Sequence, residues 1–590
     1  MRRAWVISAI AAAAVLAGVA PTARLGVRAE SAAGTPGPAA LVRGAAAFAL
    51  SQPVRSLGAP GTSPAGRATP ALPELGVAFP AGGEVRDPVV QRATGTGALP
   101  APLVSFDGIP QITGAGQVVP PDTVGEVGPG HYVQMVNSRF AVFDKTGRVL
   151  AGPTSTQELF EPLGGVCGVT DRGDPVVFYD QLADRWVLTQ FGFIDVAAGP
   201  YYECIAVSST GDPTGEYYLY AFEISDTALN DYPKFGVWPD AYYMSANMFD
   251  FAFDGSARFV GAMAVAFERE RMLAGDPDAR LVLREVPLGY SLLPADLDGP
   301  TPPPPGSPGY FLELGFDEFA GFVPELDLFR FRVDWEDPAA STFSGPTRIS
   351  TAPYDAGLCA GSYCIPQPGT FSLLDPLSDR LMHRLAYRNL AGDEALVVNH
   401  TVDAGTGHAG VRWYEIHGLR GTPVVEQGTY APDDDHRWMG SIAMDGNGNL
   451  ALGYSVSGPG TYPSVRYTGR LAADTPGEMT LGEGSLVEGA GSQTFPFGRW
   501  GDYSAMTVDP VDDCTFWYTQ EYYATTSTSG WATRSFAQLS GLSLPWRSQA
   551  TTHQRYDPAS AGALSVTVSV APVAGPKPLA TDFTFRPFGR

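Results

Sequence analysis

Polar residues recur in this sequence where short apolar runs begin. Carboxylates accept hydrogen bonds from hydroxyl groups, arginine donates a forked pair of hydrogen bonds, and tryptophan offers a flat stacking surface. Such a set predicts a binding site for a sugar-like ligand, if the runs bring it together. Otherwise these groups bond to the backbone and shape turns. The candidate ligand-binding residues are Asp122, Asp174, Asp231, Lys234, Gln367, Arg437, Trp438, Arg499 and Asp502.

Two kinds of glycan chemistry could use these residues. Glycoside hydrolysis needs two carboxylates about 5–9.5 Å apart, and Asp174 with Asp231 would supply that pair. A sialidase-like site would instead place Arg172, Arg437 and Arg499 around a substrate carboxylate. The sequence contains no Ser-x-Asp-x-Gly-x-x-Trp motif, which argues against the sialidase alternative.

Metal binding is a further alternative. Oxygen ligands from several of the opening carboxylates, including Asp296 and Asp298, could hold Ca²⁺. The oxygen-rich run 445–449 lacks the late glutamate of an EF-hand loop, and Asn447-Gly448 by itself predicts a tight hairpin turn. No His-Glu-x-x-His or Gly-x-Ser-x-Gly motif occurs, so the sequence gives no sign of a zinc site or a hydrolase elbow.

The elements that must position these residues follow a repeating pattern. A polar opening precedes an apolar run, then a turn rich in Asp, Gly, Pro or Asn, then a second aromatic and β-branched run. We therefore predict an all-β fold, a seven-bladed β-propeller, with six or eight blades as alternatives. In a propeller the openings converge on one face of the central channel. The units open at Pro120, Gly173, Asp231, Ser291, Cys364, His436 and Gly498.

The ends of the chain differ from this repeating part. Arg2 and Arg3 precede an apolar run that is too short to cross a bilayer, so we predict a signal peptide over residues 1–20 and a secreted protein. Residues 21–103 are rich in Pro, Ala and Gly and predict a disordered spacer. The propeller would occupy residues 104–544, and residues 545–590 would form a tail.

Charge and cysteines constrain the partners. The formal net charge of -24 disfavours nucleic acid and anionic membranes. We expect no membrane span and a monomer that binds a glycan or an extracellular protein. The five cysteines suit an oxidising compartment, and we predict the disulfides Cys167–Cys204 and Cys359–Cys364, which leave Cys514 over.

Several strings carry a resemblance to a known group. They include PPDTVGEVGPGHYVQMVN, YPKFGVWPDAYYM, RWMGSIAMDGNGNLALGYS and RWGDYSAMTVDP. Together these strings resemble a group of large secreted bacterial proteins, mostly uncharacterised, that are regarded as β-propellers loosely similar to sialidases in fold. The resemblance covers about residues 104–536 and implies a fold rather than a function. Members of the group carry a cysteine shortly after the Thr533-Arg534 pair, and this chain does not.

From these observations we expect an extracellular binding protein that recognises a glycan or a surface protein at the channel face. One alternative is a secreted glycan-active hydrolase that uses a carboxylate pair at the same face. Another is a structural or adhesion protein acting through loops such as 299–309.

Overall fold

The chain is an all-β protein, as predicted. The computed structural model describes residues 40–58, 85–111, 118–252, 256–317, 321–360 and 363–539, and the short strands β32 (Thr551–Thr552) and β33 (Val568–Ser569). Helices in these residues are short: the α-helices α1 (Thr156–Phe160), α2 (Gly165–Val169) and α3 (Arg269–Leu273), and the 3-10 helices η1 (Val54–Ser56), η2 (Glu161–Leu163), η3 (Pro338–Ala340) and η4 (Leu358–Ala360). The predicted signal peptide lies outside the described residues.

Most strands belong to four-stranded antiparallel units that follow one another along the chain. The first unit consists of β5 (Val124–Val127), β6 (His131–Val136), β7 (Arg139–Asp144) and β8 (Val149–Ser155), and the second of β9 (Val176–Asp180), β10 (Arg185–Gly192), β11 (Tyr201–Ser208) and β12 (Tyr217–Ser225). The third consists of β13 (Ala228–Val237), β14 (Tyr242–Phe251), β15 (Ala257–Phe267) and β16 (Arg280–Val286). The fourth consists of β17 (Leu293–Leu297), β18 (Gly309–Asp317), β19 (Gly321–Arg332) and β20 (Thr342–Ser350).

The later units repeat the arrangement. The fifth consists of β21 (Met382–Leu390), β22 (Asp393–Asp403), β23 (Ala409–His417) and β24 (Val424–Tyr430). The sixth consists of β25 (His436–Met444), β26 (Leu450–Ser457), β27 (Ser464–Arg470) and β28 (Gly484–Val487). The seventh consists of β29 (Ala505–Val508), β30 (Thr515–Tyr523) and β31 (Trp531–Leu539), and β4 (Val104–Asp107) completes it.

The first strands of these units are neighbours in cyclic order. β5 lies beside β9, and the succession continues through β13, β17, β21 and β25 to β29, which lies beside β5 again. β17 and β21 also pair directly in parallel, which joins their two units, with β3 (Val90–Gln91) as the ninth strand, into one nine-stranded sheet. Every residue of β5, β9, β17 and β29 is buried. Burial on both faces explains why these runs show no alternation of apolar and polar residues.

The hydrophobic core lies between successive sheets. One cluster joins Val187 and Tyr220 of the β9–β12 unit to Met244 and Val265 of the β13–β16 unit. Another joins the β13–β16 unit to the two units of the nine-stranded sheet. Each sheet therefore depends on its neighbour to cover its apolar face.

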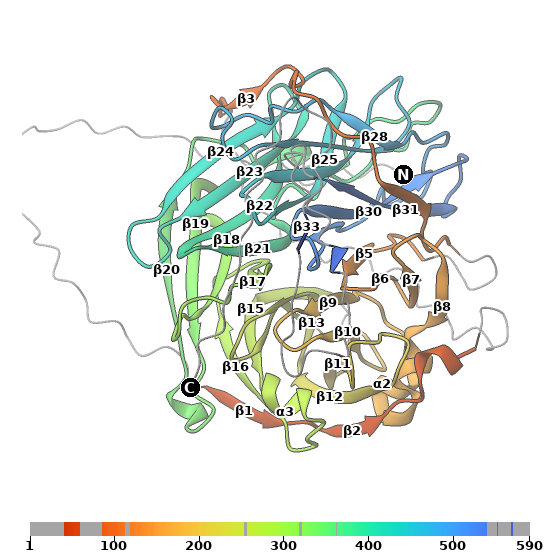
Figure 1. The fold of residues 1–590 in the computed structure, drawn as a ribbon, viewed down its shortest axis with the longest axis vertical. Coiled ribbons are helices and arrows are strands. Elements are labelled where there is room, and N and C mark those ends of the chain that lie inside the picture. Colours follow the sequence, from red (N-terminus) through yellow and green to blue (C-terminus); the bar gives the residue numbers. More distant parts are fainter. Residues whose placement is uncertain are drawn as a thin grey trace, which may run out of the picture. The chain divides into compact units, whose positions relative to one another are not determined.

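Short strands from the N-terminal part of the chain lie along outer strands (Figure 1). β1 (Leu41–Gly44) pairs with β16, β2 (Ala47–Leu50) pairs with β12, and β3 (Val90–Gln91) pairs in parallel with β24. These strands cover backbone groups that an edge strand would otherwise expose. The prediction of a disordered spacer over 21–103 is therefore wrong for residues 40–58 and 85–103. The composition of these residues was a poor guide, because a segment that pairs its backbone with an existing edge strand needs no periodic pattern of apolar residues.

A long connection between β20 and β21 covers one side of the strand openings. We name residues 351–381 the cap segment. Its residues Leu358, Ile365, Leu374 and Leu377 pack in one cluster with side chains that open β5, β25 and β29, including Trp438 and Trp500. The backbone N–H of Asp375 donates to the carbonyl of Gly498 at 2.9 Å.

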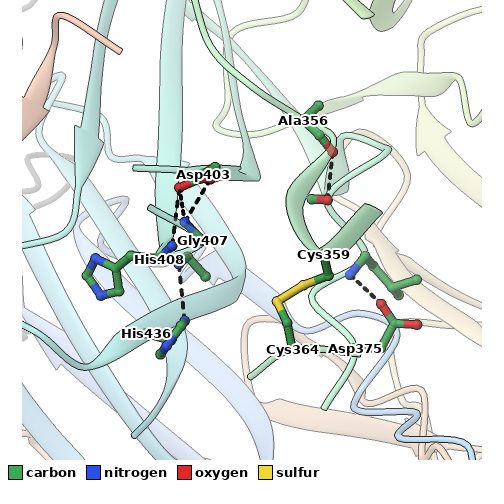
Figure 2. The surroundings of a disulfide bond; sticks show 11 residues. Ala356, Cys359, Cys364, Asp375, Asp403, Gly407, His408 and His436 are labelled. Carbon is green, nitrogen blue, oxygen red and sulfur yellow. Dashed lines mark hydrogen bonds between the residues drawn. A yellow bond between two sulfur atoms is a disulfide. The ribbon is translucent and has the colours of Figure 1, made fainter. Parts of the chain in front are cut away.

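Both predicted disulfides are present. Cys167 of α2 is bonded to Cys204 of β11, and Cys359 is bonded to Cys364 within the cap segment. Figure 2 shows the second bond beside Ala356 and Asp375, whose oxygens accept hydrogen bonds from Ser378 and from the backbone of Leu377. These contacts hold the cap segment to itself as well as to the strand openings.

Removing the two disulfides should have unequal effects. The Cys167–Cys204 bond closes a 37-residue separation and the Cys359–Cys364 bond a separation of 5. Chain entropy then predicts losses in the free energy of unfolding of about 4 and about 2 kcal/mol for the respective double Ala variants. Denaturant titration of both variants measures this order, and an equal or reversed order would contradict it.

Candidate functional site

Residues just before the first strands, or within the first half of β13 and β25, share an unusual backbone conformation. Non-glycine residues with φ between 47° and 56° occur at this place in six units, at Asp122, Asp174, Tyr232, Ser291, Met439 and Asp502. A left-handed residue turns the chain sharply, and aspartate tolerates that conformation better than most residues. The repeated turn places the openings at equivalent ends of neighbouring strands, which is why residues distant in sequence meet there.

Lys234 lies at the centre of the polar groups that meet at these openings. Its Nζ lies 3.4 Å from the centre of the Tyr232 ring and 3.9 Å from that of Tyr503. It also donates to the carbonyl of Pro233 at 3.0 Å. The side chain is only 1% exposed, and burial lowers the pKa of its amine to about 8. The two ring faces stabilise a buried cation that has lost most of its water.

Three aspartates surround this lysine, and we name Asp122, Asp174, Asp502 and Lys234 the aspartate cluster. Burial and the neighbouring carboxylates Asp502 and Asp174 raise the pKa of Asp122 well above its usual value. Burial also raises the pKa of Asp174, against the attraction of Lys234. Oδ1 of Asp122 is buried and has no hydrogen-bond partner in the protein. The cluster therefore has acceptor capacity that a hydrogen-bond donor could satisfy.

The rim of the cluster is partly exposed. Asp174, Asp231 and Arg499 are half-buried, whereas Asp122 and Asp502 are buried. Arg499 forms an ion pair with Asp502, and Oδ2 of Asp174 accepts from the backbone N–H of Tyr232 at 3.2 Å. Burial, followed by the charge of Asp174, raises the pKa of Asp231 to about 7. A ligand reaching this rim would first meet carboxylate oxygens and one guanidinium.

Residues that the sequence analysis missed complete the site. Arg380 lies over the Tyr232 ring at 4.9 Å and donates to the Tyr290 hydroxyl at 2.7 Å. Tyr290 in turn donates to Asp379 at 2.6 Å. The fifth unit opens at these residues, just before β21, rather than at Cys364 with Gln367 as its polar residue. The residues from Cys364 to the aspartate-rich turn 375–379 form no first strand, so the predicted opening came too early in the chain.

A second charged group lies further along the first strands. Arg384 of β21 forms ion pairs with Asp298 and, at 3.5 Å, with Asp296 of β17. Burial raises the pKa of Glu126 of β5 well above its usual value, opposed by the charge of Arg384. The imidazole of His383 is buried and has its pKa lowered by burial and by the charges of Lys234 and Arg384. The charges of the cluster and of this second group thus act on one histidine.

Three residues of the candidate set lie outside this cluster. Arg437 is fully buried between Asp433 and Glu483, in a strand whose register shifts only after Trp438. Trp438 packs against Trp500 with ring centres 5.9 Å apart. Gln367 exchanges hydrogen bonds with the backbone of Gln493.

The arginine triad of the sialidase alternative is not assembled. Arg172 donates to the carbonyls of Phe193 and Ile194, Arg437 is held by carboxylates, and Arg499 is paired with Asp502. Each guanidinium is thus bound to a different part of the fold.

Metal ligation finds no support in the described part of the chain. It contains no group of three or more His, Cys, Asp or Glu side chains arranged to hold a metal ion. Oδ1 of Asp445 accepts from the backbone N–H groups of Asn447 and Asn449, so this run is a turn that uses its own oxygens. A helix able to span a bilayer is likewise not found among the described residues.

Comparison with known proteins gives distant likenesses only. No family model and no curated protein match the chain. A Dyadobacter fermentans protein of unknown function is 11% identical, with 62% of this chain and 94% of that one covered and a TM-score of 0.32. A Penicillium chrysogenum alpha-L-arabinanase is 12% identical (63% and 99% covered, TM-score 0.33), and the phage phi92 endosialidase is 10% identical (69% and 73% covered, TM-score 0.33). Likenesses at this level carry no argument about function.

Lys234 should be essential to the fold of the cluster. Lys234→Met leaves only Arg499 to offset the buried carboxylates, and we expect a loss of about 3–5 kcal/mol in the free energy of unfolding. Lys145→Met is the matched control, since its partly exposed pair with Asp509 at 2.8 Å should contribute about 1 kcal/mol or less. Denaturant titration compares the two, and equal effects would show that the central cation is not needed.

Asp231 should give stability a recognisable pH dependence. Its pKa is near 3.8 in an unfolded chain and about 7 in the folded protein, so the folded state binds the proton more tightly. Its contribution to stability is therefore present at low pH and is lost as pH rises from about 4 through about 7. Asp231→Asn should remove this pH dependence. Between pH 4 and 8 we expect it to amount to about 1–2 kcal/mol in the free energy of unfolding, once screening by solvent is allowed for. Thermal unfolding of both proteins from pH 4 to 8 measures it, and parallel curves would contradict the assignment.

Proposed function

We propose that residues 104–544 form a seven-bladed β-propeller whose strand openings bind a glycan outside the cell. The blade count is supported by the four-stranded units and by the cyclic order of their first strands. The extracellular location is supported by two disulfides, which persist in oxidising compartments.

The observation that carries the binding proposal is the excess of acceptors at the rim. Asp174 and Asp231 are partly exposed, and Asp122 keeps an unpartnered oxygen beneath them. Sugars present several hydroxyl donors within a few ångströms, whereas anionic ligands would meet carboxylates and a net charge of -24. A neutral or donor-rich polysaccharide fits this site best.

A hydrolase at the same site is the second candidate. Hydrolysis of a glycosidic bond needs one carboxyl group held protonated and one held ionised. Burial raises the pKa of Asp122, while Asp502 is paired with the guanidinium of Arg499. This contrast between neighbouring carboxyl groups supports the catalytic alternative.

Titration calorimetry against a panel of soluble polysaccharides tests both candidates. We expect the Asp174→Asn/Asp231→Asn variant to bind its polysaccharide at least tenfold more weakly, because two acceptors become partly donating amides. The Asp278→Asn/Glu336→Gln variant, with exposed residues elsewhere, serves as the control and should bind as the parent protein does.

The readouts separate the candidates. Binding without release of reducing ends identifies a binding protein. Release of reducing ends that Asp122→Asn or Asp502→Asn abolishes, with binding retained, identifies a hydrolase. A parent protein that binds no polysaccharide of the panel contradicts the glycan proposal altogether.

A further inference from the structure

Two exposed phenylalanines lie beside the candidate site. Phe371, in the cap segment, is fully exposed, and Phe497, in the loop before β29, is 55% exposed. Leu373, two residues after Phe371, is 39% exposed, and its carbonyl lies against Gly498, next to Phe497. Among the residues that the structure describes, these are the exposed phenylalanines. Single exposed apolar residues are common, but a group of them in one place marks a contact surface.

The two loops that carry these rings are locked together. A Cβ atom on Gly498 would lie 2.5 Å from the carbonyl oxygen of Leu373 and 2.8 Å from the ring of Tyr363, so only glycine permits this approach. Gly498 also has a φ of 58°, and its carbonyl accepts from the backbone of Asp375. The backbones next to both exposed rings are therefore fixed before any ligand arrives.

Phe497 is supported from below by a second ring. Phe495 packs against the cluster beneath the cap segment, and its ring centre lies 5.6 Å from that of Phe497 in an edge-on arrangement. Phe497 therefore keeps a ring surface directed away from the packed interior while its neighbour anchors the loop. We name Phe371, Leu373 and Phe497 the aromatic patch.

The size and surroundings of the aromatic patch indicate the kind of partner. A stable protein interface uses about 20–30 residues on each side, far more than this patch offers. Its polar neighbours in sequence are the uncharged Thr370 and Ser372, and, two residues from Leu373 and Phe497 respectively, Asp375 and Arg499, whose opposite charges leave no net charge beside the patch. The electron-rich face of a phenyl ring attracts the weakly positive C–H groups of an apolar surface.

We infer that the aromatic patch is a stacking platform for the apolar ring faces of a neutral polysaccharide, whose hydroxyl groups extend toward the rim of the aspartate cluster. A sugar ring combines the two chemistries that the structure places side by side, a C–H face for Phe371 and Phe497 and O–H donors for the carboxylates. The inference rests on the proposed function and adds the subsite and the neutral character of the ligand.

The test uses the full chain and three soluble polysaccharides: the neutral xylan and galactomannan and the anionic alginate. We expect Phe371→Ala/Phe497→Ala to bind the neutral polymer at least tenfold more weakly, with an unchanged melting temperature, because neither side chain is needed by the core. Leu288→Ala, which removes another highly exposed apolar side chain, is the control and should change neither quantity.

A conservative replacement of Phe371 distinguishes the loss of a stacking ring from a disturbance of the fold. Phe371→Trp keeps a stacking face and should bind at least as tightly as the parent protein. Its indole fluorescence should change on addition of the neutral polymer and stay constant with alginate. A loss of binding in this variant as severe as in the alanine variant would overturn the platform.

The outcomes separate this inference from the proposed function. If the parent protein binds a neutral glycan and only the aspartate variant loses it, the platform is wrong and the proposed function stands. Tighter binding of alginate than of the neutral polymers overturns the ligand class. If no variant or parent protein binds any glycan, the proposed function itself fails.

Discussion

The arrangement of the strand openings depends on one buried cation. Lys234 lies against two tyrosine rings and among three aspartates, and burial keeps water from Lys234, Asp122 and Asp502. Removing either the positive charge or the negative charges would leave the remaining charge without its partner in a region of low polarity. The turns that carry Asp122, Asp174 and Asp502 must therefore stay in register with β13, and the same restriction keeps the rim of the cluster in a fixed shape.

Much of the fold could be predicted from sequence because its local signals agree with its packing. The turn 445–449 carries Asn447-Gly448, and β25 and β26 flank it as expected. The apolar first strands reveal burial on both faces, and the cysteine spacing was sufficient for both disulfides. The sequence analysis found the aspartates of the cluster because the equivalent openings of the first strands lie together, however far apart they are along the chain.

The remaining parts depend on contacts that no local pattern records. Arg437 matches the sequence criterion for an opening residue, but the carboxylates of Asp433 and Glu483 hold it elsewhere. Arg380 was missed because the turn 375–379 imitates a hairpin within the cap segment. The tyrosine rings around Lys234 resemble ordinary core aromatics until their distance from the amine is known.

The N-terminal edge strands have a consequence for how the chain is completed. β4 fills the last place of the sheet whose other strands lie between residues 505 and 539, and β1 pairs with β16 more than two hundred residues away. β3 and β4 are thus made long before their partners β24 and β31, whereas β1 and β2 can pair as soon as β16 and β12 have been made. Until the whole chain has emerged, several sheets keep open edges, and this interval is when the protein is most vulnerable to aggregation and proteolysis.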